Sequence, residues 1–317
     1  MRSFYFSGIY PLIVFAANQK KIGRVQLHYI NVINTYQDPN YSDHSIEFPL
    51  LVSRIAELLG LGLISHQTFT WNCPPLELGI PFKLICKPDL SLRDNDLISS
   101  NISFLFENKQ NINYAVISEG ASDLNLLSVR GFLRNIITRK HLYLICGFYQ
   151  PPLLFAILPW IHWTDHDALK PLFLKLINSN LLPCSFRDDY GDCDYIYFPS
   201  DEILPEFYLD YLKLQLKALD ILPKNVLIKP HPRDTRSYQF YFFSLGIKAI
   251  VVDYKLRIFP AELFIEAFSL RCFGGLTSAL LYTKPGHSTI SLPAPPEIVK
   301  LYKMWYFGLI RLMRIVL

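Results

Sequence analysis

The segment best suited to chemistry is Lys229-Pro230-His231-Pro232-Arg233, which gathers three cationic or imidazole groups within five residues. It follows the apolar run Asn225-Val226-Leu227-Ile228, which is typical of a buried strand. Each proline fixes its own φ and favours extended geometry in the preceding residue, so we expect His231 on a stiff loop. Such groups at the carboxyl end of a strand suit an anionic ligand, most often a phosphate. An exposed polar turn would show the same pattern.

A second candidate is Ser118-Glu119-Gly120, which follows the apolar residues Val116 and Ile117. A carboxylate at the end of a strand can accept the proton of an attacking hydroxyl if its pKa and geometry are suitable. Gly120 would let a ligand or another backbone segment approach closely. Taken alone, the pattern also fits an acidic residue in a turn.

Two further segments place polar groups at predicted helix starts. In Phe259-Pro260-Ala261-Glu262 the carboxylate lies in the first helical turn, where the helix dipole also favours it. In Phe273-Gly274-Gly275-Leu276-Thr277-Ser278-Ala279, two hydroxyls follow a glycine turn. They could cap a helix and, together with free backbone N–H groups, bind a phosphate. Neither segment specifies a ligand on its own.

In their order along the chain, these segments resemble the motifs of bacterial sialyltransferases and polysialyltransferases. The family has an acidic-acidic-glycine motif, a His-Pro motif and a paired-hydroxyl motif, and the resemblance covers residues 114–120 and 226–283. One departure is Ser118, which stands where the family has its first acidic residue. The resemblance implies an α/β fold with two facing Rossmann-like domains, the GT-B architecture, and an active site in the interdomain cleft.

The resemblance also implies two catalytic residues. Glu119 would be the general base on the acceptor hydroxyl, and His231 would contact the phosphate of a CMP leaving group. A sugar that leaves a nucleotide monophosphate passes through an oxocarbenium-like state. The site must therefore stabilise the departing phosphate and deprotonate the acceptor on the opposite face of the sugar. We expect an inverting transfer that needs no metal ion and no other cofactor.

Further residues would bind the substrate and its nucleotide. By the resemblance, Glu262 would hold the ribose hydroxyls, and Lys229 would line the nucleotide side of the cleft. The paired hydroxyls would bind the phosphate from the start of a helix. The full predicted set of binding residues is Gly120, Lys229, Pro232, Glu262, Thr277 and Ser278.

The expected function is transfer of sialic acid, or a related nonulosonic acid, from its CMP-activated donor to a glycan acceptor. Two alternatives stay open at the level of sequence. One is a transferase in surface polysaccharide synthesis that uses CMP-Kdo or CDP-glycerol, because the same phosphate-binding motifs would serve those donors. The other is a catalytically inactive glycan-binding protein, which the departure at Ser118 suggests.

The elements that must position these residues follow from the apolar runs. Strands are predicted at residues 3–6, 25–33, 82–86, 114–117, 195–198, 225–228 and 248–252. Helices are predicted at residues 11–20, 45–59, 206–219 and from Pro260 onward. This alternation favours a parallel sheet. Charge, glycine and proline collect at residues 183–194, so we predict an N-terminal acceptor-side domain at 1–185 and a C-terminal nucleotide-binding domain at 186–317.

Composition sets the broad class. A chain of 317 residues with 51% hydrophobic residues excludes a disordered protein, and a net charge of +4 without basic blocks does not indicate nucleic-acid binding. Six cysteines without a CxxC pair fit the reduced thiols of a cytoplasmic protein. The apolar start, residues 4–17, is interrupted by Pro11, which favours a strand and a helix over a signal peptide.

Two other segments resemble metal sites. Asp192-Cys193-Asp194 resembles the Asp-x-Asp motif that binds a divalent cation in other glycosyltransferases, but an exposed acidic loop is the better interpretation. His162 and His166 have the spacing of zinc ligands on a helix, yet Pro159 and the neighbouring tryptophans favour a loop. We therefore expect no metal site.

The C-terminal segment, residues 297–317, mixes four basic residues with aromatic and aliphatic ones. It fits either an interfacial helix or a terminal helix packed on the fold. If it touches lipid, the expected surface is the cytoplasmic face of an anionic membrane, where membrane-bound glycans would be assembled.

Overall fold

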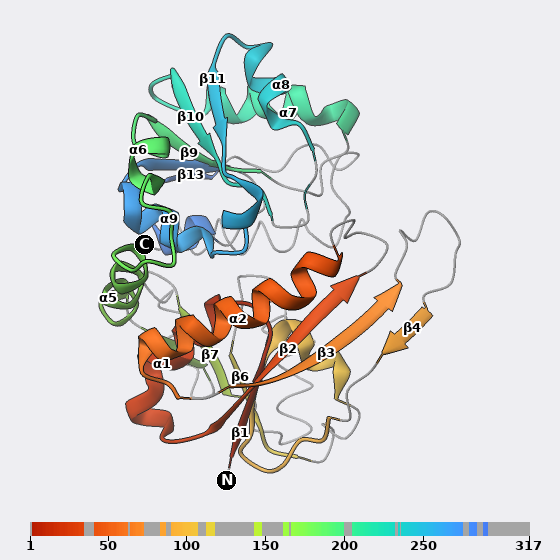
Figure 1. The fold of residues 1–317 in the computed structure, drawn as a ribbon. Coiled ribbons are helices and arrows are strands. Elements are labelled where there is room, and N and C mark those ends of the chain that lie inside the picture. The colour runs from red at the N-terminus through yellow and green to blue at the C-terminus, as the bar shows by residue number, and fades with distance from the viewer. Residues whose placement is uncertain are drawn as a thin grey trace. The chain divides into compact units, whose positions relative to one another are not determined.

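The computed structural model divides into two compact units, and among the described elements the division falls between strand β8 and helix α5 (Figure 1). It describes residues 2–34, 41–62, 64–72, 83–86, 90–106, 112–117, 143–147, 161–164, 166–199, 205–231, 234, 236–274, 279–283 and 288–290. The boundary predicted between residues 185 and 186 lies one helix further along the chain than this division.

The first unit is built on a sheet in which eight strands are described. They are β1 (Ser3–Phe6), β2 (Gln26–Asn34), β3 (Ile64–Asn72), β4 (Lys83–Cys86), β5 (Leu97–Ser99), β6 (Ala115–Ile117), β7 (Tyr143–Gly147) and β8 (Ile161–Thr164). Their order in the sheet is β4-β3-β2-β1-β5-β6-β7-β8, with β3 and β4 antiparallel and the pairs from β3 to β7 parallel. The helices of this unit are α1 (Tyr10–Ile22), α2 (Tyr41–Leu59) and the short 3₁₀ helix η2 (Ser100–Leu105).

The second unit is built on a parallel sheet in which five strands are described: β9 (Tyr195–Phe198), β10 (Asn225–Ile228), β11 (Lys248–Val251), β12 (Arg271–Gly274) and β13 (Ser288–Ile290). Its helices are α5 (His166–Ile177), α6 (Phe186–Tyr190), α7 (Pro205–Lys217), α8 (Tyr238–Phe243), the 3₁₀ helix η5 (Tyr254–Leu256), α9 (Ala261–Phe268) and α10 (Ala279–Tyr282). The strand order is β11-β10-β9-β12-β13.

This order creates a topological switch point next to β9. The chain runs outward from β9 through β10 to β11, and then returns to the other side of β9 as β12. In open α/β sheets, ligands bind outside the carboxyl ends of the strands at such a point. The carboxyl ends of β9, β10 and β12 are therefore where a ligand is expected.

Helices α7 and α8 pack against one face of the second sheet (Figure 1). Tyr195 and Tyr197 of β9 share one core cluster with α7 and α8, together with Val226 and Ile228 of β10. Inside this cluster the Tyr197 and Tyr208 hydroxyl oxygens are 2.6 Å apart, and the Tyr197 hydroxyl donates to Gln215 Oε1 (2.9 Å), so both buried phenols are hydrogen-bonded. The aromatic core fixes the strands whose carboxyl ends carry the candidate residues.

The predicted α/β class with parallel sheets is confirmed. Strands β1, β9 and β10 have the predicted limits, and α2 ends before Gly60, whose φ of +74° explains the glycine at that position. The sequence patterns missed β3, β5, β7, β8, β12 and β13, most of which are short or rich in polar residues. Among them, β3, β5 and β12 are specified by pairing with β2, β1 and β9 more than by their own composition.

The apolar start of the chain forms β1 and the beginning of α1, as predicted. Within the described ranges, no helix is long and apolar enough to cross a membrane. The C-terminal segment at residues 297–317 lies outside the described residues.

Gly274 marks a close approach of two strands at the switch point. It ends β12 opposite Phe198, the last residue of β9. A Cβ atom built on Gly274 would lie 2.4 Å from the carbonyl oxygen of Phe198. Because that oxygen belongs to the backbone, no side-chain rotation can make room, so only glycine fits.

We therefore expect Gly274→Ala to lower the free energy of unfolding by about 3 kcal/mol, because overpacking a buried site forces the backbone apart. The comparison is Gly246→Ala, where an added Cβ meets nothing within 4 Å but φ is +72°. That change should cost about 1 kcal/mol. Urea unfolding of the three proteins measures both, and equal costs at the two glycines would contradict the steric explanation.

Candidate functional site

Three of the predicted site residues, Lys229, His231 and Glu262, lie in the described part of the second unit. The others lie outside the described residues: Glu119, Gly120, Pro232, Thr277 and Ser278. In sequence, Glu119 comes two residues after the end of β6, and Ser278 directly precedes α10. A helix therefore begins directly after the paired hydroxyls, as expected from the sequence.

The segments that carry the site leave the sheet at its carboxyl edge. Strands β10 and β12 pair with opposite sides of β9, so their last residues, Ile228 and Gly274, lie two strand spacings apart, about 10 Å. The His-Pro segment follows Ile228, and the paired-hydroxyl segment follows Gly274. Both predicted phosphate-binding segments therefore start beside the end of β9, at the switch point.

His231 presents an exposed side chain on a loop held by main-chain bonds. The N–H of Lys229 donates to the Tyr197 carbonyl (3.0 Å), which continues the strand pairing, and the N–H of Asp234 donates to the His231 carbonyl (3.0 Å). The first bond anchors the start of the loop to β9, and the second closes a turn within the loop after His231. The imidazole therefore lies on a loop and not on a helix, as expected.

Lys229 lies beneath this loop with only 6% of its surface exposed. Its Nζ donates to the carbonyl oxygens of Arg257 (2.8 Å) and Pro230 (3.3 Å) and lies over the ring of Phe264. Burial lowers the pKa of the amine to about 7. Lys229 therefore supports the loop from inside, and its predicted contact with a nucleotide stays a prediction.

Glu262 is the second buried ionisable residue of the site, with 9% of its surface exposed. It lies in the first turn of α9, after Pro260 at the N-cap, as the sequence predicted. Burial raises its pKa to about 7, although its own backbone N–H and the nearby charge of Lys229 act in the opposite direction. Desolvation outweighs these attractions, so a carboxyl group is kept buried near Lys229 at a cost in stability.

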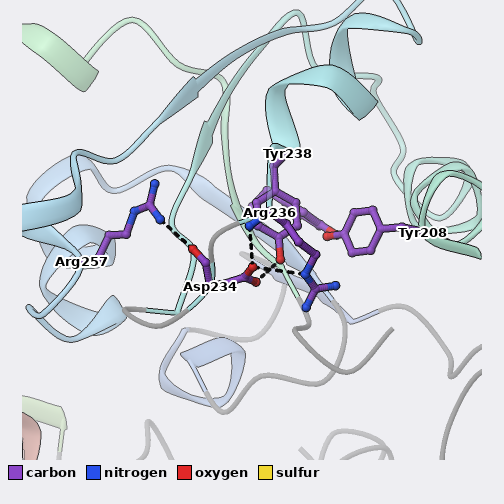
Figure 2. A network of polar contacts seen from close by, with 6 residues as sticks. Tyr208, Asp234, Arg236, Tyr238 and Arg257 are labelled. Atoms are coloured by element: carbon purple, nitrogen blue, oxygen red, sulfur yellow. Dashed lines mark hydrogen bonds and ion pairs between the residues drawn. The ribbon is translucent and has the colours of Figure 1, made fainter. Parts of the chain in front are cut away.

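A polar network around Asp234 anchors the far end of the loop (Figure 2). The Asp234 carboxylate accepts hydrogen bonds from the backbone N–H and the Nε of Arg236 (3.0 and 3.2 Å) and from the Tyr238 hydroxyl. The Arg236 guanidinium also lies over the rings of Tyr208 and Tyr238. The loop is in this way bonded to the tyrosine-rich core under α7 and α8.

Glu266 links three helices behind the site. Its Oε1 accepts hydrogen bonds from His166 Nε2 of α5 (2.9 Å) and from the Tyr282 hydroxyl of α10 (3.0 Å). Burial raises its pKa, but these two bonds and the charges of His166 and Lys170 together lower it more, so the pKa lies below its usual value. Because Glu266 lies one turn after Glu262, it orients the helix that carries the predicted ribose contact.

The sequence patterns missed Asp234 and Glu266. Asp234 directly follows the cationic segment, and an acidic residue there is a signal for a side chain that fixes a turn. Glu266 stands four residues after Glu262, a spacing that places both carboxylates on one face of α9. Its partners His166 and Tyr282 are far away in sequence, and no local pattern pairs them.

The two resemblances to metal sites are explained by other contacts. The Asp194 carboxylate accepts the backbone N–H groups of Asn225 and Lys224 (both 2.9 Å), which lower its pKa, at the amino edge of the sheet and away from the loop of His231. His162 lies on strand β8, not in the predicted loop, and contacts Asn18, whereas His166 begins α5. A zinc site on one helix would need both histidines on that helix.

Comparisons with known proteins give only weak structural likeness. No protein-family model and no curated protein sequence matches the chain. One similar solved structure is an alpha/beta-galactoside alpha-2,3-sialyltransferase from the luminous marine bacterium Photobacterium phosphoreum, with 10% sequence identity and a TM-score of 0.38. The alignment covers 98% of this chain and 95% of that chain. At that TM-score the likeness carries no functional argument, so we infer function from the residues of the chain.

The burial of Glu262 predicts a pH-dependent stability change for Glu262→Gln. Because the folded-state pKa is raised from 4.5 to about 7, the carboxylate destabilises the fold above pH 7 and not below pH 4.5. The variant should therefore be more stable than the parent by about 3 kcal/mol at pH 8, and equally stable at pH 4.5. Urea unfolding at the two pH values measures the difference.

The matched control is Glu206→Gln, which changes an exposed carboxylate in the first turn of α7. It should alter stability by no more than a few tenths of a kcal/mol at either pH. A Glu262→Gln protein that is destabilised at both pH values would contradict the proposed cost of burial.

Proposed function

We propose that the chain is a glycosyltransferase that moves sialic acid, or a related nonulosonic acid, from a CMP-activated donor to a glycan acceptor. The observation that carries the proposal is an exposed His231, held by buried support at the carboxyl edge of a doubly wound sheet. A nucleotide bound at such an edge would place a phosphate beside the imidazole. The order of the four sequence motifs selects the CMP-sugar chemistry.

In this proposal, His231, Thr277 and Ser278 stabilise the departing phosphate of CMP, and Glu262 holds the ribose. Glu119 removes the proton of the acceptor hydroxyl as that oxygen attacks the anomeric carbon. Attack on the face opposite the leaving group inverts the configuration at that carbon. The leaving group is a monophosphate, so hydrogen bonds and one imidazolium can supply the stabilisation that a divalent cation supplies to a diphosphate.

We place the reaction in the cytoplasm, in the synthesis of a surface polysaccharide. CMP-sugars and reduced cysteines fit that compartment. The aromatic and basic residues at 297–317 support peripheral contact with an anionic membrane, where a growing glycan would be anchored. Two facing domains with the site between them complete the proposed architecture.

Two single substitutions test the catalytic roles. We expect Glu119→Gln and His231→Ala each to lower turnover of the CMP-sugar by about 100-fold or more, because one removes the base and the other removes the phosphate contact. Circular dichroism and urea unfolding check that both variants are folded. Unchanged rates in both variants would contradict the site assignment, and an inert parent protein would favour the glycan-binding alternative.

The identity of the donor is tested by parallel hydrolysis and transfer assays with CMP-sialic acid, CMP-Kdo and CDP-glycerol. We expect turnover of CMP-sialic acid with release of CMP, and the same rate after treatment with a chelator, because the leaving monophosphate needs no cation. Turnover of CDP-glycerol with none of CMP-sialic acid would select the alternative donor. A rate that falls on chelation and recovers with a divalent cation would overturn the metal-independent mechanism.

A further inference from the structure

Arg257 joins the loop of His231 to the segment that leads into α9. It directly follows the 3₁₀ helix η5, five residues before Glu262. Its Nη1 donates to the Asp234 carbonyl (2.8 Å), and its own carbonyl accepts the Lys229 Nζ (2.8 Å). We name these two bonds the Arg257 brace; the Asp234 arm appears in Figure 2.

The brace holds the loop on both sides of His231. Lys229 lies two residues before the histidine and Asp234 three residues after it, and both are buried. The Asp234 arm ends on a main-chain carbonyl of the loop and restrains its backbone, whereas the other arm joins the side-chain amine of Lys229 to the main chain of Arg257. The His231 carbonyl accepts the N–H of Asp234, so restraint at Asp234 reaches the imidazole residue directly.

A guanidinium suits this position better than an amine. Besides the Asp234 arm, Arg257 donates from Nε to the Val252 carbonyl (3.0 Å), just after β11, and its guanidinium lies over the ring of Tyr254. One rigid planar group therefore bonds two carbonyls at a fixed separation. A lysine could reach one of them but could not set the distance between the loop and the end of β11.

We propose that Arg257 is a positioning residue that sets the placement of His231 relative to Glu262. Within the proposed function, on which this inference rests, it fixes the spacing between the phosphate contact and the ribose contact of the nucleotide. Its side chain acts through the loop and not on the ligand. Removing it should leave the core under α7 and α8 intact while the loop of His231 loses its alignment.

The first test is independent of any ligand. Amide hydrogen exchange of peptides spanning residues 229–238 is compared between the parent protein, Arg257→Met and the control Arg187→Met. Arg187 lies exposed on α6, and its Nη2 contacts only a side-chain oxygen, that of Asn178, among the bonds described for it. We expect exchange in the loop to rise at least tenfold in Arg257→Met alone, with peptides of β9 and β10 unchanged.

Loop exchange equal to that of the parent would overturn the brace. Exchange raised throughout the second unit would also overturn it, because Arg257 would then be a general stabilising residue. Arg257→Lys keeps the positive charge but removes the planar fork of donors, so it separates the effect of charge from the effect of geometry. Exchange restored to the parent level by lysine would contradict the need for two simultaneous carbonyl contacts.

The second test measures positioning with CMP and the CMP-sugar. For Arg257→Met we expect a roughly tenfold weaker Kd for CMP by calorimetry, and kcat/KM lowered by about 100-fold with a share of that loss in kcat. Arg187→Met should match the parent. A loosened loop with unchanged kcat and KM would overturn the positioning role. If the parent protein neither binds CMP nor turns over the donor, the proposed function fails, while the exchange experiment still decides the brace.

Discussion

The candidate site depends on main-chain hydrogen bonds that hold the loop after β10. A loop at the edge of a parallel sheet loses its strand partners and must satisfy its N–H and carbonyl groups elsewhere. Here the Tyr197 carbonyl accepts the N–H of Lys229, the Lys229 amine donates to the Pro230 carbonyl, and the Arg257 guanidinium donates to the Asp234 carbonyl. The imidazole can therefore be exposed and still be well placed. Pro230 and Pro232 flank His231 in the sequence, and each proline restricts the backbone of the loop.

This support has an energetic cost. Lys229 and Glu262 are both buried, and burial lowers the pKa of the amine and raises the pKa of the carboxyl group, which favours the neutral form of each. A well-packed apolar pair at these positions would avoid the desolvation penalty. Residues that lower the stability of the fold are typical of functional sites, where their polarity serves a ligand and not the fold. The tyrosine core under α7 and α8 supplies compensating stability close by.

The parts of the fold that could be predicted are those with a strong local pattern. The run 225–228 is apolar, ends at proline-rich residues and forms β10 as predicted, and Pro260 starts α9. The prolines beside His231 likewise predicted that this residue lies on a loop. Long-range partners have no such signal: nothing near Glu266 in sequence identifies His166 or Tyr282. Strand β12 was not predicted because Gly274 suggests a turn. The glycine is needed there because the carbonyl oxygen of Phe198 lies too close for a Cβ atom.

The structure also separates two roles that the cationic segment 229–233 combined. Lys229 points its amine at carbonyl oxygens within the protein, and burial reduces its charge, so it supplies hydrogen bonds to the loop and little attraction for an anion. His231, two residues later, is exposed and can present its imidazole to a ligand. A phosphate at this edge would then be recognised by directed hydrogen bonds more than by net charge. In the proposed function, such recognition would hold the phosphate of the leaving CMP in one orientation.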